Sequence, residues 1–367
     1  MIPSHVYEKS LRSFLEPILP YLDDPSVSEV MINGPEHIYV ERRGQLTRVD
    51  SRFPSQEALL SALRNIAQFV GRPLDNYHPI LEGRLPDGSR IEALLPPISP
   101  DGPSVAIRRF SKDTLTIDKL LSFGSLTPDS AQTLSAIVGA KQNIIVSGGT
   151  GSGKTSMLNC LSSFIPEGDR VVVIEDAREL QLQQSHVVQL EGRPADSRGK
   201  GQITIRDLFK ATLRMRPDRI VVGEIRGGEA LELIQAMTSG HGGCMSTVHA
   251  SYPKDSMSRL ETMALMSGID LPLSALRSQI SSAIDIIVQV GRVRDGSRRV
   301  THITEVIGCD EHNQYKLQDL FVVEHGEDGK KPAFVPTGVL PACLEAIRIH
   351  GHDLPPAVYA AAKRRQR

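Results

Sequence analysis

A glycine-rich run at residues 148–155, GGTGSGKT, is the clearest chemical signal in the sequence. It fits the pattern Gly-x4-Gly-Lys-Thr, follows the apolar run NIIVSG and precedes a stretch with helical character. Glycines let a backbone wrap a phosphate with several N–H groups pointing inward, and the next helix presents its positive end to the same phosphate. Lys154 can then reach the β and γ phosphates, and the Thr155 hydroxyl can hold Mg²⁺. The predicted loop residues are Gly148, Gly149, Thr150, Gly151, Ser152, Gly153, Lys154 and Thr155, with Ser156 next.

Acidic residues and one histidine follow further apolar runs. RVVVIED ends in Glu175 and Asp176, RIVVGE ends in Glu224, and STVHA carries His249. Ligands of open α/β sheets bind at the carboxyl ends of the strands, where a phosphate loop also lies. Hydrolysis of a nucleotide needs one carboxylate to orient or deprotonate water and another in the magnesium shell. Glu175 and Glu224 are the candidates for these two tasks, whereas the pattern around His249 alone favours a structural histidine.

Four arginines precede the glycine-rich loop: Arg84, Arg90, Arg108 and Arg109. They fit salt bridges on a solvated surface. They also fit arginine fingers, which neutralise the charge that develops on a γ-phosphate. Composition does not choose between these two interpretations.

The elements around these groups predict two domains. Residues 1–110 mix short strands with one helix after Ser55, as in a small α+β domain, and residues 111–126 are predicted to be a linker. Residues 127–367 alternate apolar runs with helical patterns, which is typical of an α/β domain whose parallel sheet is covered on both faces. Its strands are predicted at 143–148, 170–176, 219–225 and 243–250, and its helices at 154–164, 204–215 and 228–239. A hairpin around an Asp295–Gly296 turn is predicted after Asp285.

Composition limits the function classes. The chain has 367 residues, with 42 Lys and Arg against 43 Asp and Glu, so its formal net charge of −1 gives no bulk attraction to nucleic acid or acidic lipid. Aromatic residues make up 4% and Trp is absent, which disfavours a stacking platform for single strands. The four cysteines are far apart in the sequence, and neither a signal peptide nor a membrane-spanning run is evident. We therefore expect a cytoplasmic protein with at most peripheral membrane association.

Taken together, an ordered series of segments resembles the ATPase superfamily of type II and type IV secretion systems. The likeness is closest to the tight-adherence (Tad/Flp) pilus assembly ATPases of the CpaF type. The segments lie at 30–46, 83–97, 105–110, 147–155, 174–194, 213–231, 238–250 and 258–263. The resemblance implies a RecA-like P-loop domain with a smaller α+β N-terminal domain, and ATP with Mg²⁺ as the ligands. Two positions depart from the family pattern: Gly242 stands where an Asp is usual, and Ser156 where a second Thr is frequent.

The resemblance also implies residue roles. Glu175 would be the catalytic base, and Glu224 would support Mg²⁺ through water. His249 matches the family's histidine box and would contact the γ-phosphate. Arg90 and Arg108 match N-terminal-domain arginines that resemble fingers, and Arg84 is a weaker third.

The implied function is a hexameric motor that powers assembly of a Tad/Flp-type pilus, or type II/IV secretion, by ATP hydrolysis. Its partners would be five further copies of the chain and an inner-membrane platform protein, at the cytoplasmic face of the inner membrane, with no direct nucleic acid. One alternative is the ATPase of a DNA- or effector-exporting type IV system. A second is a RecA-like nucleic-acid motor, which neutral charge and sparse aromatics disfavour. A third is a GTP-dependent switch, although the usual guanine-reading Asn/Thr-Lys-x-Asp segment does not occur.

Overall fold

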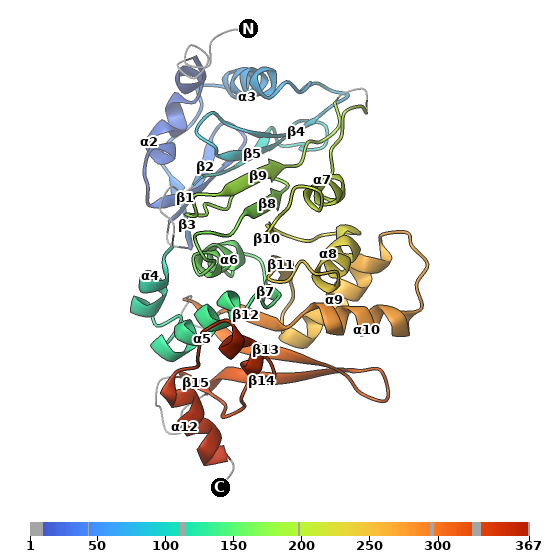
Figure 1. Ribbon diagram of the computed structural model, residues 1–367. Coiled ribbons are helices and arrows are strands. Elements are labelled where there is room, and N and C mark those ends of the chain that lie inside the picture. The colour runs from blue at the N-terminus through green and yellow to red at the C-terminus, as the bar shows by residue number, and fades with distance from the viewer. Residues whose placement is uncertain are drawn as a thin grey trace. The chain divides into compact units, whose positions relative to one another are not determined.

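The computed structural model (Figure 1) describes residues 10–42, 44–110, 115–196, 199–293, 297–324 and 332–365. The chain divides into two compact units. Unit 1 comprises Met1–Asp113 and Ala195–Lys200, and unit 2 comprises Thr114–Pro194 and Gly201–Arg367. The predicted Asp295–Gly296 turn lies outside the described residues, as do residues 111–114 of the predicted linker.

Unit 1 is built on a six-stranded sheet in the order β3-β2-β1-β6-β5-β4, in which all neighbouring strands are antiparallel. Its elements are the 3-10 helix η1 (Glu16–Ile18), α2 (Leu19–Leu22), β1 (Val27–Asn33), β2 (His37–Arg42), β3 (Gln45–Val49), α3 (Gln56–Val70), β4 (Ile80–Arg84), β5 (Arg90–Leu94) and β6 (Ser104–Arg108). The Ser55 side chain caps α3, which ends at Gly71 with a left-handed φ of 73°. Leu59, Leu63 and Ile66 of α3 pack in one core with the inward residues of the strands. The strands and the helix predicted from the sequence of this region are confirmed.

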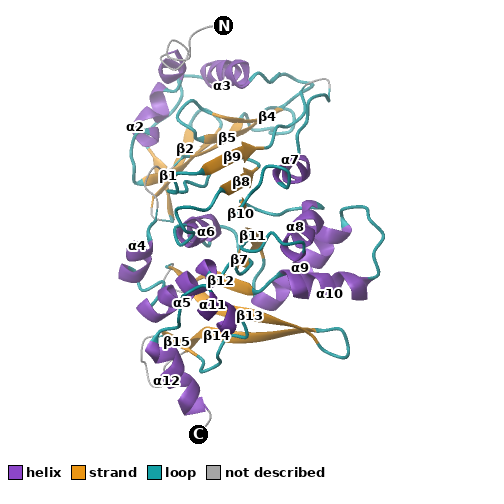
Figure 2. Ribbon diagram, in the orientation of Figure 1, coloured by secondary structure: helices purple, strands orange, loops and turns teal. Residues whose placement is uncertain are grey.

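Unit 2 is a larger α/β unit (Figure 2). Its helices are α4 (Ile117–Ser122), α5 (Pro128–Gly139), α6 (Lys154–Ser162), α7 (Ile205–Thr212), α8 (Glu229–Thr238), α9 (Pro253–Leu265), α10 (Leu273–Ala283), α11 (Leu344–Ile349) and α12 (Pro356–Arg365). Its strands are β7 (Ile144–Gly148), β8 (Val171–Glu175), β9 (Val187–Glu191), β10 (Arg219–Val222), β11 (Met245–His249), β12 (Ile286–Arg292), β13 (Arg298–Cys309), β14 (Tyr315–Glu324) and β15 (Ala333–Pro336).

These strands form one mixed sheet in the order β15-β14-β13-β12-β7-β11-β10-β8-β9. The pairs from β12 to β9 are parallel, and the pairs from β12 to β15 are antiparallel. The expectation of a parallel sheet therefore holds for one part of the sheet only. The two strands of the predicted C-terminal hairpin are β12 and β13, which pair antiparallel. In addition, β12 pairs with β7, so the hairpin continues the main sheet into β14 and β15.

Two apolar cores cover the two faces of this sheet. Alternate residues of each parallel strand face opposite sides, as Val146 and Ile145 of β7 do. The first core joins the strands to α5, α6, α11 and α12. The second joins them to α7, α8, α9 and α10. The near-continuous apolar strands in the sequence reflect burial on both faces.

Part of the predicted linker at 111–126 is instead folded. Helix α4 begins after Thr116, whose side chain accepts a hydrogen bond from the Lys119 N–H, and Leu120 and Leu126 are buried in the first core of unit 2. The polar and turn-forming residues of this segment predicted a linker, although Leu120 and Leu126 pack in the core. Helix α5 begins at the predicted point, with Thr127 as its cap in a capping box.

Candidate nucleotide-binding site

The glycine-rich loop joins the end of β7 to the start of α6, as predicted. Gly151 and Gly153 have φ angles of +68° and +95°, a conformation that side chains disfavour. A Cβ atom at Gly148 would lie 2.4 Å from Ser152 Oγ and 2.5 Å from the Val290 carbonyl oxygen. The loop therefore has a sharply turned backbone with no room for a side chain at its base. That is the backbone needed to direct N–H groups at a phosphate.

Lys154 is the first residue of α6 and only 8% exposed. Its ammonium donates a 3.0 Å hydrogen bond to the Gly149 carbonyl oxygen and lies 3.3 Å from both ring nitrogens of His249. Thr155 and Ser156 follow in the first turn of α6 and are half-buried. The predicted phosphate-binding side chains thus stand at the amino end of a nine-residue helix.

Sheet register brings the predicted acidic residues and His249 to the same edge. His249 of β11 is the partner of Gly148 of β7 across the parallel pair. Strand β8 ends at Glu175, and β10, which lies between β11 and β8, is followed by Glu224. The carboxyl ends of parallel strands meet at one edge, and this edge also carries the glycine-rich loop.

Glu224 lies between a histidine and an arginine. Its Oε1 is 2.6 Å from His249 Nε2, and its Oε2 accepts hydrogen bonds of 3.0 Å and 2.6 Å from the Arg226 guanidinium. Burial and the nearby Lys154 ammonium lower the pKa of His249, against the opposing effect of the Glu224 carboxylate. The hydrogen bond to Glu224 raises the pKa of Arg226. Lys154, His249, Glu224 and Arg226 therefore form one continuous polar chain.

Arg226 was not among the residues predicted from the sequence. Its position two residues after Glu224, in GEIRGG, is a signal that could have found it, because alternate residues of an extended segment face the same side. His249 was expected to be structural on its pattern alone. The structure instead places it against Lys154 and Glu224.

Glu175 is held in a different way. It is 4% exposed, and its Oε1 accepts hydrogen bonds from the backbone N–H groups of Glu179 (2.9 Å) and Leu180 (3.0 Å). A Cβ atom at Gly223 would lie 2.9 Å from the Glu175 Cγ. The glycine before Glu224 therefore gives the Glu175 side chain its space, and the backbone turn after β8 fixes one of its carboxylate oxygens.

The donors at this edge suit Mg²⁺. Magnesium prefers oxygen ligands and is usually held by one or two protein groups together with substrate phosphates. Thr155, which carries the hydroxyl, follows Lys154 in the first turn of α6. The Glu224 carboxylate contacts His249, and His249 contacts Lys154. Hydroxyl and carboxylate oxygens of this kind fit the ion.

Three of the four predicted arginines share one face of the sheet in unit 1. Arg84 is the cross-strand partner of Arg90, and Arg90 is the partner of Arg108. Directly opposed residues lie on the same face, so the three side chains form a row over β4, β5 and β6. Arg90 also donates a 2.6 Å hydrogen bond to Glu82.

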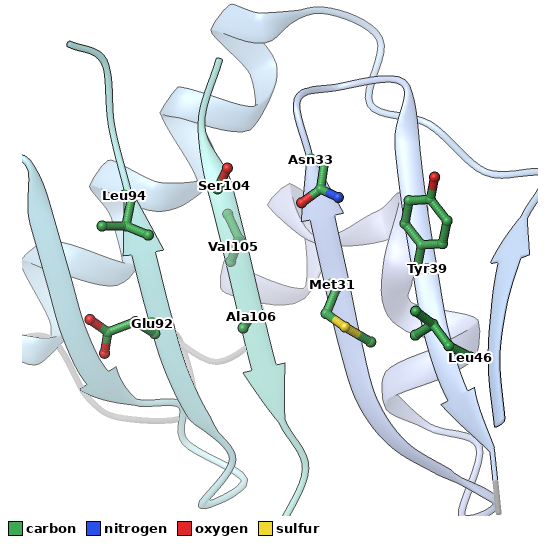
Figure 3. A pocket seen from close by; sticks show the side chains of 9 residues that line it. All are labelled: Met31, Asn33, Tyr39, Leu46, Glu92, Leu94, Ser104, Val105 and Ala106. Atoms are coloured by element: carbon green, nitrogen blue, oxygen red, sulfur yellow. The ribbon is translucent and has the colours of Figure 1, made fainter. Parts of the chain in front are cut away.

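The same face has an apolar hollow of about 280 Å³ (Figure 3). Met31, Tyr39 and Leu94 are among its lining side chains, with Glu92 beside them. Glu92 and Leu94 alternate with the inward residues of β5, as Arg90 does. The arginine row and the hollow thus belong to the face opposite the one whose residues pack in the core of unit 1.

Arg109 has another role. Its guanidinium donates hydrogen bonds to the backbone carbonyls of Asp24 and Val27, the latter at 2.8 Å. It therefore ties the segment before β1 to the end of β6. Arg109 is therefore structural, whereas the finger role of Arg108 stays a prediction.

The departure at Gly242 lies away from these groups. A Cβ atom there would be 3.2 Å from the carbonyl oxygen of Lys141. Lys141 precedes β7, and Gly242 precedes β11. Both residues are therefore at the amino ends of parallel strands, opposite the edge that holds the glycine-rich loop.

The sequence model of the family described as "Type II/IV secretion system protein" matches residues 13–323. The chain belongs to this family. The predicted superfamily, the enzyme class of ATPase and the fold class of a RecA-like P-loop domain with a smaller α+β domain are confirmed.

Relatives with known names support the same family. The chain is 33% identical over 318 residues to the type IV secretion system protein PtlH of Bordetella pertussis, covering 80% of this chain and 94% of PtlH. It is 32% identical over 308 residues to the conjugal transfer protein TrbB of Rhizobium radiobacter, covering 83% of this chain and 90% of TrbB. The ATPase DotB of Legionella pneumophila has a similar fold, with a TM-score of 0.55, 20% identity and 82% of each chain covered. These names are not those of Tad/Flp pilus proteins, so the closer likeness to that branch stays a prediction. Among the helices that the structure describes, none has both the length and the apolar character needed to cross a membrane.

Proposed function

We propose that this ATPase is a motor that binds Mg-ATP on the glycine-rich loop and couples its hydrolysis to assembly of a pilus or to type II/IV secretion. The observation that supports this proposal is the continuous contact of Lys154 with His249 and of His249 with Glu224, beside the loop. A cation, an imidazole and a carboxylate at the carboxyl edge of a parallel sheet suit phosphoryl chemistry.

Each side chain at this edge has a proposed task. The backbone from Gly148 to Thr155 surrounds the phosphates, and the Lys154 ammonium exchanges the Gly149 carbonyl for β and γ phosphate oxygens. The Thr155 hydroxyl and the Glu224 carboxylate, the latter through water, would hold Mg²⁺, and the ion would neutralise phosphate charge when bound. Glu175 accepts the proton of the attacking water, and His249 donates a hydrogen bond to the γ-phosphate.

The arginine row of unit 1 is proposed to supply the fingers. Carboxylates already lie beside the row, because Glu82 accepts a hydrogen bond from Arg90 and Glu29 is the cross-strand partner of Arg108. Arg90 and Arg108, with Arg84 as a weaker third, would neutralise the γ-phosphate as its charge develops. Unit 1 would then close on bound nucleotide and open after hydrolysis, and this movement is the output of the motor.

The machine served by the motor has two candidates. The first is a Tad/Flp-type pilus, which the sequence segments resemble. The second is a type IV system that exports DNA or effectors, and the names of TrbB and PtlH favour it. For both candidates we propose a homo-hexamer docked on a platform protein at the cytoplasmic face of the inner membrane, without direct contact with nucleic acid. Deletion of the gene separates them, because loss of surface pili with accumulation of pilin supports the first, and loss of DNA or effector transfer supports the second.

ATP hydrolysis by a Lys154→Ala variant tests the proposed site. We expect nearly all turnover to disappear while circular dichroism stays unchanged, because the charge that neutralises the phosphates is gone. Lys210→Ala, which removes an exposed lysine from α7, is the matched control and should retain wild-type turnover. Near-normal turnover in Lys154→Ala would exclude the glycine-rich loop as the site of hydrolysis.

A further inference from the structure

A polar stripe on α9 faces the strand end that carries His249. Asp255, Ser258, Arg259 and Thr262 are spaced by three, one and three residues, so they lie on one side of the helix. Together with the segment 249–251 they line a pocket of about 360 Å³. None of the proposed catalytic steps uses the α9 stripe.

Hydrogen bonds fix both walls of this pocket. The Ser256 hydroxyl, on the inner side of α9, donates a 2.7 Å hydrogen bond to the Ser147 hydroxyl of β7. Gln289 of β12 donates through Nε2 to the carbonyls of Ala250 (3.3 Å) and Ser251 (3.1 Å). The pocket is therefore held by side chains of two strands that flank the glycine-rich loop, and its shape does not depend on a long loop.

The charges that line the pocket are not paired with each other. No hydrogen bond or ion pair joins the Arg259 guanidinium to another residue in the described part of the chain, although Asp255 lies one turn away. Arg259 and His249 both line the pocket, and the positive charge of Arg259 adds to burial and the Lys154 ammonium in lowering the pKa of His249. The pocket thus offers a guanidinium, the hydroxyls of Ser251 and Ser258, and one carboxylate.

This set of groups has a chemical complement. A guanidinium and hydroxyls donate hydrogen bonds to the oxygens of a tetrahedral oxyanion. A carboxylate repels an anion unless the anion carries a proton that it can donate. Phosphate at neutral pH carries such a proton, whereas sulfate does not. Asp255 beside Arg259 therefore favours phosphate over sulfate.

We propose that this pocket binds inorganic phosphate on its way out of the nucleotide site. The inference rests on the proposed hydrolysis of ATP, because that reaction produces the phosphate. His249 belongs to both places: it contacts Lys154 and Glu224, and it lines the pocket. A phosphate that leaves the glycine-rich loop on this side passes from Lys154 to Arg259 along the His249 imidazole.

Binding of inorganic phosphate to the nucleotide-free protein, followed by ³¹P NMR line broadening, tests the proposal. Arg259→Gln should raise the dissociation constant for phosphate about tenfold or more, because a charge-assisted hydrogen bond is lost. Lys254→Gln removes a neighbouring positive charge that does not line the pocket and should change little. Lys154→Ala should still bind phosphate, since the pocket is separate from the P-loop. The opposite pattern, with binding lost in Lys154→Ala and kept in Arg259→Gln, would place the phosphate on the P-loop and overturn the inference, as would absence of binding to the wild type.

Asp255→Asn provides the second measurement. Wild-type phosphate binding should resist competition by sulfate, and Asp255→Asn should let sulfate compete at concentrations near those of phosphate. Equal competition by sulfate in both proteins would exclude the proposed role of the carboxylate. Failure of the proposed function has a different signature, because a wild type without ATP hydrolysis would remove the source of phosphate whatever the pocket binds.

Discussion

Asp285, which stands just before β12, allows a prediction whose size follows from the structure. Burial raises the pKa of its carboxyl from 3.8 to about 6, and the negative charge of Glu305 adds to the rise. The hydrogen bond that its Oδ2 accepts from the Asn143 N–H, at 2.7 Å, acts in the opposite direction. The folded protein therefore holds this proton more tightly than the unfolded chain does.

The sign of the pH dependence follows directly. Below about pH 4 the carboxyl is protonated in both states and costs nothing. Between about pH 4 and pH 6 the unfolded chain loses the proton first, so stability falls as the pH rises, and above about pH 6 the loss is complete. At about 1.4 kcal/mol per pKa unit, the rise in pKa corresponds to roughly 3 kcal/mol of lost stability at pH 7 and above.

Asp285→Asn resembles the protonated carboxyl at every pH, since its amide oxygen can still accept the Asn143 hydrogen bond. We expect the variant to exceed the wild type in stability by roughly 3 kcal/mol at pH 8, and by much less at pH 4.5. Urea unfolding followed by circular dichroism, at several pH values, measures the difference. Asp270→Asn changes an exposed carboxylate of the same type and should track the wild type. A variant less stable than the wild type at pH 8 would refute the reasoning, because the charged hydrogen bond would then outweigh burial.

Two further predictions concern the proposed motor. Glu175→Gln should bind Mg-ATP yet hydrolyse it very slowly. In Glu224→Gln, a higher Mg²⁺ concentration should partly restore ATP turnover. If phosphate release shows more residual turnover in Glu175→Gln than in Glu224→Gln, the two roles are reversed. Arg108→Ala should lower kcat far more than nucleotide affinity. Arg109→Ala should lower Tm more than Arg108→Ala does, because two backbone carbonyls lose their donor. Unchanged kcat in a well-folded Arg108→Ala protein would reject the finger.

Local sequence patterns predict most of the residues of the candidate site. The strand before the glycine-rich loop and the helix after it are visible in residues 143–164, because buried strands are short apolar runs and the loop has a fixed pattern. The contact between His249 and Lys154 is different. It depends on β11 lying next to β7, a pairing between segments about a hundred residues apart that no local pattern encodes. For the same reason the sequence did not predict that β12 joins the main sheet beside β7.

The arginines of unit 1 show which features the sequence predicts and which depend on strand pairing. In β6 the inward residues Val105 and Ile107 fix the parity of the strand, so the sequence alone sets Arg108 outward and Arg109 on the other side. The same reading of β5 sets Arg90 outward. The alternation of residues along one strand predicts the face on which a side chain lies, but not the residue opposite it on the next strand. That Arg90 opposes Arg108 depends on the register across the connection at 95–103, and a slip of one residue would move every side chain of β5 to the other face. The positive row is thus a property of strand pairing, and the proposed finger function requires this one register.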